Sequence, residues 1–382
     1  MGMNFPSSPT VGQAYPSPSV PGLPQYVWDG AAWNSGAVFE SYDKIADNNL
    51  FLNSGMEVSQ EFGGTAMAKA NNAWSYTQDQ WNLYTAGSGT FIFEGQKPPP
   101  GTMPVRGFRT CLRLTCGSVY TMAGGSDLIS LAQPIEGNRW AKMAYGTTAA
   151  LPVTINFWVY STVTGNMSVG IRNSAQDRIY VTSATINAAS TWEYKSVTIP
   201  GDIIGTWLTD TGLGANIFFS FGGGATYTAA PANTWGSVNG WAHPGVTNFF
   251  ATINNQVLLT GMIATPGSVG ISAAMSPMMM RSFADDLFQC RRYFVYETYV
   301  AGGKWLHPID PGAGYRRSTH HFSPLMRVAP VMTVAGGANG TFAAGHPQVA
   351  GTTYPYSCEL QGDLTTAAGY SYLTSLKAVA RM

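Results

Sequence analysis

Between residues 46 and 300, apolar side chains recur at every second position in short segments, and clusters of glycine and polar residues separate these segments. The clearest alternating segments are 154–160 and 192–199, whereas 217–221 and 249–253 are shorter and more apolar. Because successive side chains of a strand point to opposite faces, the alternation indicates strands that bury one side. Helical periodicity is almost absent from this region. The pattern predicts a sandwich of two β-sheets or a jelly roll.

The composition favours the same fold class. The 44 glycines and 23 prolines interrupt helices, whereas the aromatic residues, 13% of the chain, fit a pleated surface. Charged residues make up only 10% of the 382 residues, against roughly 25% in an average soluble protein. A surface with so little charge suits a subunit that is buried in an assembly. We therefore expect an all-β protein that works within a larger structure.

The charges also restrict the partners. Lys and Arg together number 20, as do Asp and Glu, so no net charge attracts the chain to nucleic acid or to anionic lipid. No run of 18 apolar residues occurs, and the N-terminus lacks the charged start and apolar run of a signal peptide. The sequence therefore predicts no nucleic-acid partner, no membrane insertion, and assembly in the cytoplasm.

The first of three zones, residues 1–45, begins with a proline-rich arm that should be extended and unable to form its own core. A hairpin is predicted at 26–33, where Asp29-Gly30 lies between aromatic positions as in a tight turn. One hairpin is marginally stable alone, so we expect this zone to attach to a virion neighbour or to another copy of the chain. The residues assigned to attachment are Phe5, Tyr15, Tyr26, Trp28 and Trp33.

The second zone, 46–300, is the predicted jelly roll and ends in a predicted helix at 282–297. Ser282 can cap this helix, and Asp285 and Asp286 lie in its first turn, where the helix dipole favours negative charge. One apolar stripe is expected to pack on the core: Phe283, Leu287, Cys290 and Phe294. The third zone, 301–382, is again rich in glycine, proline, threonine and tyrosine, and predicts a small C-terminal β-domain.

Several blocks of the chain carry a resemblance when they are taken in order. The blocks are Asn49-Leu-Phe-Leu-Asn-Ser-Gly-Met-Glu-Val-Ser-Gln60, Trp74-Ser-Tyr-Thr-Gln-Asp-Gln-Trp81, Gln133-Pro-Ile-Glu136 with Val153-Thr-Ile-Asn-Phe-Trp-Val159, Asp286-Leu-Phe-Gln-Cys-Arg-Arg-Tyr-Phe294, and Met326-Arg-Val-Ala-Pro-Val331 with Ala378-Val-Ala-Arg-Met382. Over residues 47–382 this order resembles a family of bacteriophage tail-fibre and prophage virion proteins. Ser54 stands where that family usually has glycine, and Gln80 stands where it usually has arginine.

The resemblance implies a virion structural protein that contains a carbohydrate-binding-like jelly roll. It implies a fibre or appendage subunit whose partners are other virion proteins and, by analogy with phage fibres, further copies of itself in a homotrimer. Whether such a subunit belongs to the head or to the tail of the particle does not follow from these blocks.

Motifs for catalysis or for metal binding are missing from the sequence, which predicts no catalytic residue, no metal and no cofactor. His320 and His321 are neighbours that a strand would point to opposite faces, so they cannot easily share an ion. The four cysteines do not complete a set of zinc ligands. We expect them to be reduced and to pack as small buried hydrophobic residues: Cys111, Cys116, Cys290 and Cys358.

Aromatic residues in the loops of region 205–248 are candidates for sugar binding. Trp and Tyr rings form stacking platforms for sugars, and polar side chains reach the hydroxyl groups. The candidates are Trp207, Tyr227, Trp235 and Trp241. Two interpretations stay open, since the same rings could instead fill a core or a trimer interface.

We expect a non-enzymatic virion component, a fibre subunit that also binds host-surface polysaccharide. The alternatives are a glycan-degrading tailspike enzyme and a head-decorating fibre without a receptor. An enzyme would need two carboxylates about 5 to 10 Å apart across the glycan. Asp202 with Asp210, or Glu359 with Asp363, could be assigned this role, as could any acidic pair.

The low charge and the apolar segments predict self-association. Trp28, Trp33 and the segment 275–280 offer apolar surface that a monomer would hide poorly. We therefore predict that the protein sediments as a stable homotrimer. A well-behaved monomer at micromolar concentration would contradict this prediction.

Overall fold

A computed structural model gives the fold of most of the chain. The described residues are 5–11, 13–17, 26–28, 30–35, 46–69, 71–237, 240–299, 305–306, 314–339, 348–350, 352–364 and 370–382. Strands account for 44% of the structure and helices for 8%, which confirms the predicted all-β class. No described helix is both long enough and apolar enough to cross a membrane. The chain divides into two compact units, residues 1–47 and residues 48–382.

The first unit is a small antiparallel sheet of three strands. Its order is β1 (Ala14–Tyr15), β2 (Tyr26–Trp28) and β3 (Trp33–Ser35). The predicted hairpin is present, because Trp28 pairs with Trp33 across β2 and β3, and their ring centroids are 5.7 Å apart. Gly30 in the turn has a φ of 106°, which glycine adopts without steric cost.

The proline-rich arm differs from the extended, unpacked peptide that the sequence predicts. Ala14 and Tyr15 pair with β2, and the ring of Phe5 lies 5.0 Å from that of Tyr26 and 5.1 Å from that of Trp33. The stretch 10–15 contains no proline, so its N–H groups are free to pair with a neighbouring strand. The aromatic residues assigned to attachment therefore already pack on one another within this unit.

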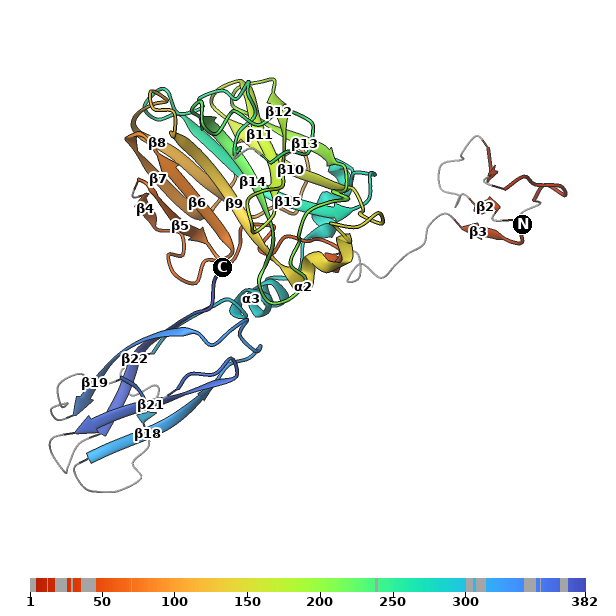
Figure 1. Ribbon diagram of the computed structural model, residues 1–382. Helices are drawn as coiled ribbons and strands as arrows, with labels where there is room; N and C mark the ends of the chain where they lie inside the picture. Colours follow the sequence, from red (N-terminus) through yellow and green to blue (C-terminus); the bar gives the residue numbers. More distant parts are fainter. Residues whose placement is uncertain are drawn as a thin grey trace. The chain divides into compact units, whose positions relative to one another are not determined.

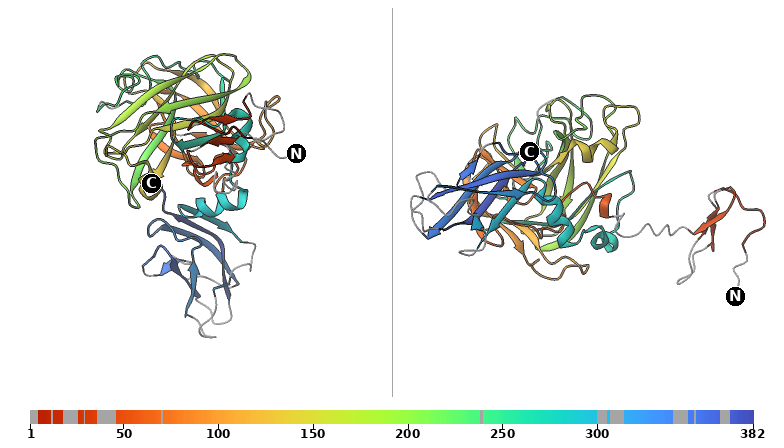
Figure 2. Two further views of the ribbon diagram at one scale, coloured as in Figure 1. Left: turned by 90° about the vertical axis from the view of Figure 1, so that its right-hand side faces the viewer. Right: turned by 90° about the horizontal axis from the view of Figure 1, so that it is seen from below.

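The second unit contains two six-stranded antiparallel sheets that pack face to face (Figures 1 and 2). The β13–β4 sheet has the order β13 (Thr191–Ile199), β10 (Val153–Ser161), β15 (Gln256–Pro266), β8 (Cys111–Thr121), β7 (Ser88–Lys97) and β4 (Ala66–Lys69). The β12–β5 sheet has the order β12 (Ile179–Ile186), β11 (Gly165–Arg172), β14 (Leu213–Gly223), β9 (Leu128–Glu136), β6 (Trp81–Ala86) and β5 (Ala73–Gln78).

Eight of these strands, β8 to β15, are connected as a jelly roll. β8 pairs with β15, β9 with β14, β10 with β13 and β11 with β12. The chain thus runs as one long hairpin that is folded over, with its strand pairs distributed between the two sheets. Strands β4 to β7 extend each sheet by two strands. The predicted jelly roll is therefore confirmed.

The core lies between the sheets, as the alternation predicts. On β14, Ile217, Phe219 and Phe221 are completely buried in the main hydrophobic cluster. The intervening side chains of Asn216 and Phe218 lie on the other face of the sheet, because the strand alternates. One face of the β12–β5 sheet is thus committed to the core, and the other is available for further packing or binding.

The helices are short, and α2 and α3 lie at one end of the sandwich (Figure 1). The helical segments with described bounds are α2 (Gly137–Trp140), the 3₁₀ helices η1 (Ala141–Met143) and η2 (Ala273–Met279), and α3 (Phe283–Arg291). Ser282 caps α3 as predicted and accepts a hydrogen bond from the N–H of Asp285.

The predicted helix 282–297 is too long, because α3 ends at Arg291 and Phe294 opens strand β16 (Phe294–Thr298). The sequence Phe-Val-Tyr-Glu-Thr is rich in aromatic and β-branched residues, which favour a strand. The expected apolar stripe is also interrupted, since Cys290 is fully buried whereas Phe283 is 51% exposed.

Two smaller sheets form the C-terminal β-domain. One contains β16, β22 (Tyr370–Val379), β17 (Trp305–Leu306) and β19 (Val331–Asn339), and the other has the order β18 (Gly314–His321), β21 (Ser357–Leu364) and β20 (Gln348–Ala350). Leu360, Leu373 and Leu376 belong to a hydrophobic core separate from that of the jelly roll. This domain begins before the expected boundary at residue 301, because β16 pairs along β22.

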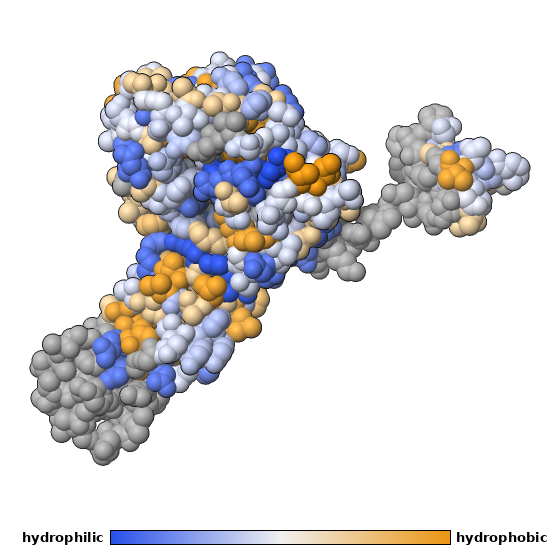
Figure 3. Space-filling view, viewed as in Figure 1, coloured by the Kyte–Doolittle hydropathy of each residue, from blue (hydrophilic) through white to orange (hydrophobic). Residues whose placement is uncertain are grey.

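Several apolar side chains of the second unit are exposed. Met275 and Met278, from the segment expected to offer apolar surface, are 46% and 48% exposed. Phe288, Leu325 and Val331 are also exposed, and Figure 3 shows apolar residues gathered where the C-terminal β-domain adjoins the jelly roll. The homotrimer stays a prediction.

Residues 49–58 form a buried segment that belongs to no sheet. Backbone groups that are buried outside regular structure need other hydrogen-bond partners. The carboxamide of Asn49 accepts a hydrogen bond from the N–H of Ala264 at 3.0 Å. The carboxamide of Asn53 donates to the carbonyl of Asp79, also at 3.0 Å. Asparagine side chains thus tie the segment to two strand regions.

Side chains from distant parts of the chain complete the hydrogen bonds of this segment. Gln133 of β9 accepts from the N–H of Leu52 at 2.7 Å and donates to its carbonyl at 2.8 Å. Arg139 and Arg281 both donate to the carbonyl of Asn49, at 3.2 and 2.8 Å. Blocks that are far apart in the sequence therefore meet here, and their role at this place is structural.

Asp286 of α3 is the acidic member of this network. Its side chain is 7% exposed and lies 3.7 Å from Arg281, and it accepts a hydrogen bond from the N–H of Asn53 at 3.2 Å. Burial raises the pKa of Asp286 from 3.8 to about 6, and the positive charge of Arg281 opposes this rise. Asp286 therefore does more than interact favourably with the helix dipole, the role that its first-turn position suggests.

We predict that Asp286→Asn changes the pH dependence of stability. A carboxyl whose pKa is raised on folding stabilises the folded state below about pH 4, and this contribution is lost as the pH rises through 6. The unfolding free energy of the native protein, relative to that of the variant, should therefore fall between pH 4 and pH 7 in urea titrations. Asp285→Asn, on the same turn but exposed, is the control. A relative stability that rises with pH would contradict the raised pKa.

Candidate functional site

A groove lies on the outer face of the β12–β5 sheet. It consists of two adjoining cavities of about 220 and 180 Å³, which share Trp74, Gln176 and Trp241. The strand residues that line it occupy the positions that alternate with the core positions: Asn82, Tyr84, Leu128, Ala132, Pro134 and Asn216. Because the pleat sends the intervening side chains into the core, the strand period alone places these residues outside.

Four aromatic rings line the groove. The ring centroids of Trp74 and Trp241 are 5.1 Å apart with their planes at 49°, and Tyr84 lies 5.2 Å from Trp74. Tyr227 hydrogen-bonds to Tyr84, and burial raises the pKa of Tyr84. Trp74 is 39% exposed, so its ring is open to a ligand. Trp241 is only 7% exposed, so Trp74 provides the main open ring surface of the groove, with the half-buried rings of Tyr84 and Tyr227 beside it.

The loop after β14 positions Trp241 and Tyr227. The N–H of Trp241 donates to the carbonyl of Tyr227 at 3.0 Å, and the hydroxyl of Ser220 donates to the carbonyl of Trp241. The guanidinium of Arg172 lies 4.2 Å from the centre of the Trp241 ring, and Phe218 packs at 4.9 Å. Burial lowers the pKa of Arg172 to about 10, so the side chain keeps its charge at neutral pH and holds the ring by a cation–π contact.

Three carboxamides, of Asn82, Gln176 and Asn216, lie among the rings. A carboxamide both donates and accepts hydrogen bonds, as a sugar hydroxyl does. The Oδ1 atom of Asn82 is buried and accepts no hydrogen bond from any residue in the described part of the chain. A buried acceptor without a partner is costly, so the fold alone does not explain this carboxamide at the groove.

The four aromatic residues proposed from the sequence fall into two sets. Tyr227 and Trp241 line the groove. Trp207 is 7% exposed and stacks on Trp140 with centroids 5.9 Å apart, and Trp235 lies 5.8 Å from Trp207. Trp207 and Trp235 therefore contribute to the main core and do not line the groove.

Sequence reasoning missed Trp74, Tyr84 and Asn82. Trp74 and Tyr84 come from adjacent strands and pair directly in the register of β5 and β6. The available signal was in the alternating segments 73–78 and 81–86, because Trp74 and Tyr76 share one face of their strand and Tyr84 lies on the face opposite to Trp81. Aromatic residues on the outer face of a strand leave apolar surface outside the core. This feature could have indicated a binding surface on this sheet.

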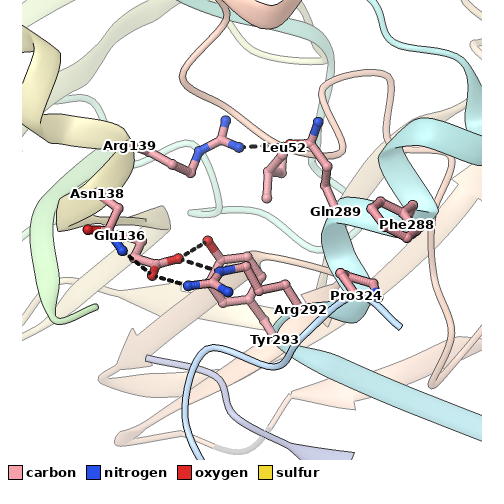
Figure 4. A pocket seen from close by; sticks show the side chains of 9 residues that line it. All are labelled: Leu52, Glu136, Asn138, Arg139, Phe288, Gln289, Arg292, Tyr293 and Pro324. Carbon is pink, nitrogen blue, oxygen red and sulfur yellow. Dashed lines mark hydrogen bonds and ion pairs between the residues drawn. The ribbon is translucent and has the colours of Figure 1, made fainter. Parts of the chain in front are cut away.

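A second pocket, of about 280 Å³, lies where α3 meets the end of β9, and Figure 4 shows its side chains. Arg292 donates two hydrogen bonds to the carboxylate of Glu136, at 2.6 and 2.9 Å, and Tyr293 donates a third at 2.7 Å. Burial by itself would raise the pKa of Glu136, but the bonds from Arg292 and Tyr293 hold it below its ordinary value. A carboxylate occupied in this way serves as a cross-link between β9 and α3 and is poorly suited to proton transfer.

Of the acidic pairs considered from the sequence, Asp202 and Asp210 take part in hydrogen bonds within the fold. Asp202 is buried, and its two oxygens accept hydrogen bonds from Arg178 at 2.6 and 2.8 Å. Asp210 accepts from the N–H of Gly212 at 2.8 Å. The other pair, residues 359 and 363, lies along strand β21.

The two neighbouring histidines follow the expectation from strand geometry. His320 is buried and His321 is exposed, so the two rings point to opposite faces. Among the described residues, no group of three or more His, Cys, Asp or Glu side chains could hold a metal ion. All four cysteines, Cys111, Cys116, Cys290 and Cys358, are buried and form no disulfide bond, in agreement with their interpretation as small hydrophobic residues.

Comparisons with known proteins give no family. No family model and no curated protein matches this chain. Among solved structures, the enzymatically active domain of tailspike protein 4 of bacteriophage CBA120 is similar at 12% identity and a TM-score of 0.30, over 57% of this chain but only 21% of that one. A CBM4 structure (12% identity, TM-score 0.27) matches 55% of this chain and 99% of its own, and a family 11 carbohydrate-binding module from Clostridium thermocellum (10%, 0.27) matches 54% and 98%. Similarities at these TM-scores carry no argument about function.

Proposed function

We propose that this protein is a non-enzymatic subunit of a bacteriophage particle and that it binds a glycan of the host surface through the groove of its jelly roll. The observation that carries the proposal is the groove itself, in which the rings of Trp74 and Trp241 meet beside three carboxamides. Sugars present CH faces that pack on aromatic rings and hydroxyl groups that hydrogen-bond to carboxamides. Two adjoining cavities favour an extended ligand of several sugar units.

The virion part of the proposal is supported by the ordered sequence blocks, which resemble those of tail-fibre and prophage virion proteins. The compact unit of residues 1–47, with its half-buried aromatic cluster, suits attachment to a neighbouring protein. The non-enzymatic part is supported by the lining of the groove, which includes no Asp or Glu among the described residues. Hydrolysis of a glycan there would need two carboxylates from elsewhere.

Trp74→Ala should weaken glycan binding about tenfold, because one lost ring contact costs roughly 1.4 kcal/mol. Trp74 is 39% exposed, so the fold should survive the change. The affinity for purified host capsule or lipopolysaccharide is measured by calorimetry, with Trp28→Ala in the first unit as the matched tryptophan control.

Two results would contradict this proposal. If both tryptophan variants bind as tightly as the unmodified protein, the groove is not the glycan site. If the intact protein releases new reducing ends from the polysaccharide, the tailspike enzyme is the better account.

Deletion of residues 1–47 should leave the second unit folded and the particle without this protein. The hydrophobic cores of the second unit begin at Leu50 and include none of the removed residues, so the thermal midpoint should change little. Immunogold labelling of particles that carry the truncated or the full-length chain measures incorporation and also identifies head, collar or tail. Normal incorporation of the truncated chain would show that attachment uses another surface.

A further inference from the structure

The C-terminal β-domain carries a pocket of about 320 Å³ that is separate from the groove and from the Glu136 pocket. It lies over the strand pair β18 and β21, where Thr319 and Glu359 stand opposite each other in register. The chain just before β21 supplies further lining residues, Thr352, Tyr354 and Tyr356. The volume is at the lower end of the range for small-ligand pockets, roughly 300 to 1,000 Å³.

Two tyrosine rings dominate this pocket. Tyr354 and Tyr356 are 47% and 53% exposed, and their rings stack with centroids 5.2 Å apart and planes 12° apart. Stacking covers one face of each ring and leaves the rest of the pair in water. Apolar ring surface that stays exposed in the free protein gains free energy when a ligand covers it.

The backbone holds the two rings in place. Tyr354 and Ser357 exchange backbone hydrogen bonds, at 2.8 and 3.3 Å, and Pro355 fixes φ between the two tyrosines. The carbonyl of Tyr356 accepts from the N–H of Phe322 at 2.9 Å. The loop is thus tied both to itself and to the segment after β18. A ligand would lose little free energy to ordering it.

Polar groups border the rings on the side of the sheet. Glu359 is exposed on β21, the central strand of its sheet, with Thr319, Thr352 and Ser357 in the same pocket. A carboxylate can accept hydrogen bonds from two hydroxyls at once, and a threonine hydroxyl both donates and accepts. An apolar ring surface beside several acceptors matches a pyranose, which has CH groups on its faces and hydroxyls around its rim.

We propose that this pocket is a second saccharide-binding site, which takes one uncharged sugar unit. The CH face of the sugar packs on the open face of one ring of the tyrosine pair, and one of its hydroxyls donates to Glu359. The site is independent of the groove, since its residues all belong to the C-terminal β-domain. Two sites on one chain hold a glycan-covered surface at two points, which raises avidity without tightening either site.

The test uses the full-length protein in saturation-transfer-difference NMR with the methyl glycosides of glucose, galactose, mannose, N-acetylglucosamine and N-acetylgalactosamine. The saturation-transfer signal of at least one glycoside should persist in Trp74→Ala. It should fall about tenfold in the double variant Tyr354→Ala/Tyr356→Ala and in Glu359→Gln. Val331→Ala, an exposed apolar position of the same domain, should keep full transfer. Unchanged thermal midpoints of the three pocket and control variants would exclude unfolding as the cause.

Three results would overturn the second site. Transfer that disappears in Trp74→Ala and persists in the tyrosine variant would assign the sugar to the groove alone and leave the proposed function intact. Absence of transfer to all five glycosides would exclude an uncharged sugar. Tetramethylammonium is the competing probe, because a carboxylate beside tyrosine rings also suits a cation. Tyrosine-dependent transfer to that ion alone would make the pocket a cation site.

Discussion

The second unit depends on one constraint, that the buried backbone of residues 49–58 must find hydrogen-bond partners outside any sheet. Gln133 supplies them from β9, Arg139 from the end of α2, and Asp286 from α3. Each buried group left without a partner would cost about 1 to 3 kcal/mol. The same contacts therefore close one end of the jelly roll and join it to the helix that leads into the C-terminal β-domain. The sequence blocks that resemble those of virion proteins therefore have a structural role here, because their side chains provide these hydrogen bonds.

With one face of each sheet committed to the core, binding chemistry is left to the outer faces. The groove uses the outer positions of β5 and β6 together with a loop that carries Trp241 over β14, where Arg172 and Phe218 hold the ring. The tyrosine pair of the C-terminal β-domain likewise lies outside a core, where a proline-containing loop holds the two rings beside a smaller sheet. In both places a rigid scaffold holds exposed aromatic surface, and rigidity lowers the cost of binding.

The sandwich could be predicted because strand alternation is a local property, which the chain shows without knowledge of its partners. The end of α3 could not, since the apolar spacing continues to Phe294 while the pairing of β16 with β22 is non-local. Residue type alone suggested Tyr227 and Trp241, yet it equally suggested Trp207, whose core position depends on the neighbouring Trp140. Trp74 enters the site only through its register with Tyr84, which no single segment of the sequence reveals.

The central claim is that the outer face of the β12–β5 sheet binds an intact host glycan. The most direct measurement is a crystal structure of the protein with an oligosaccharide prepared from the host surface. The account predicts an uncleaved chain of sugars in the groove, with a sugar ring packed on Trp74 and hydroxyls hydrogen-bonded to the carboxamides that line the groove. Sugar bound only at other surfaces, with the groove filled by solvent, would contradict it, as would a cleaved oligosaccharide in the groove.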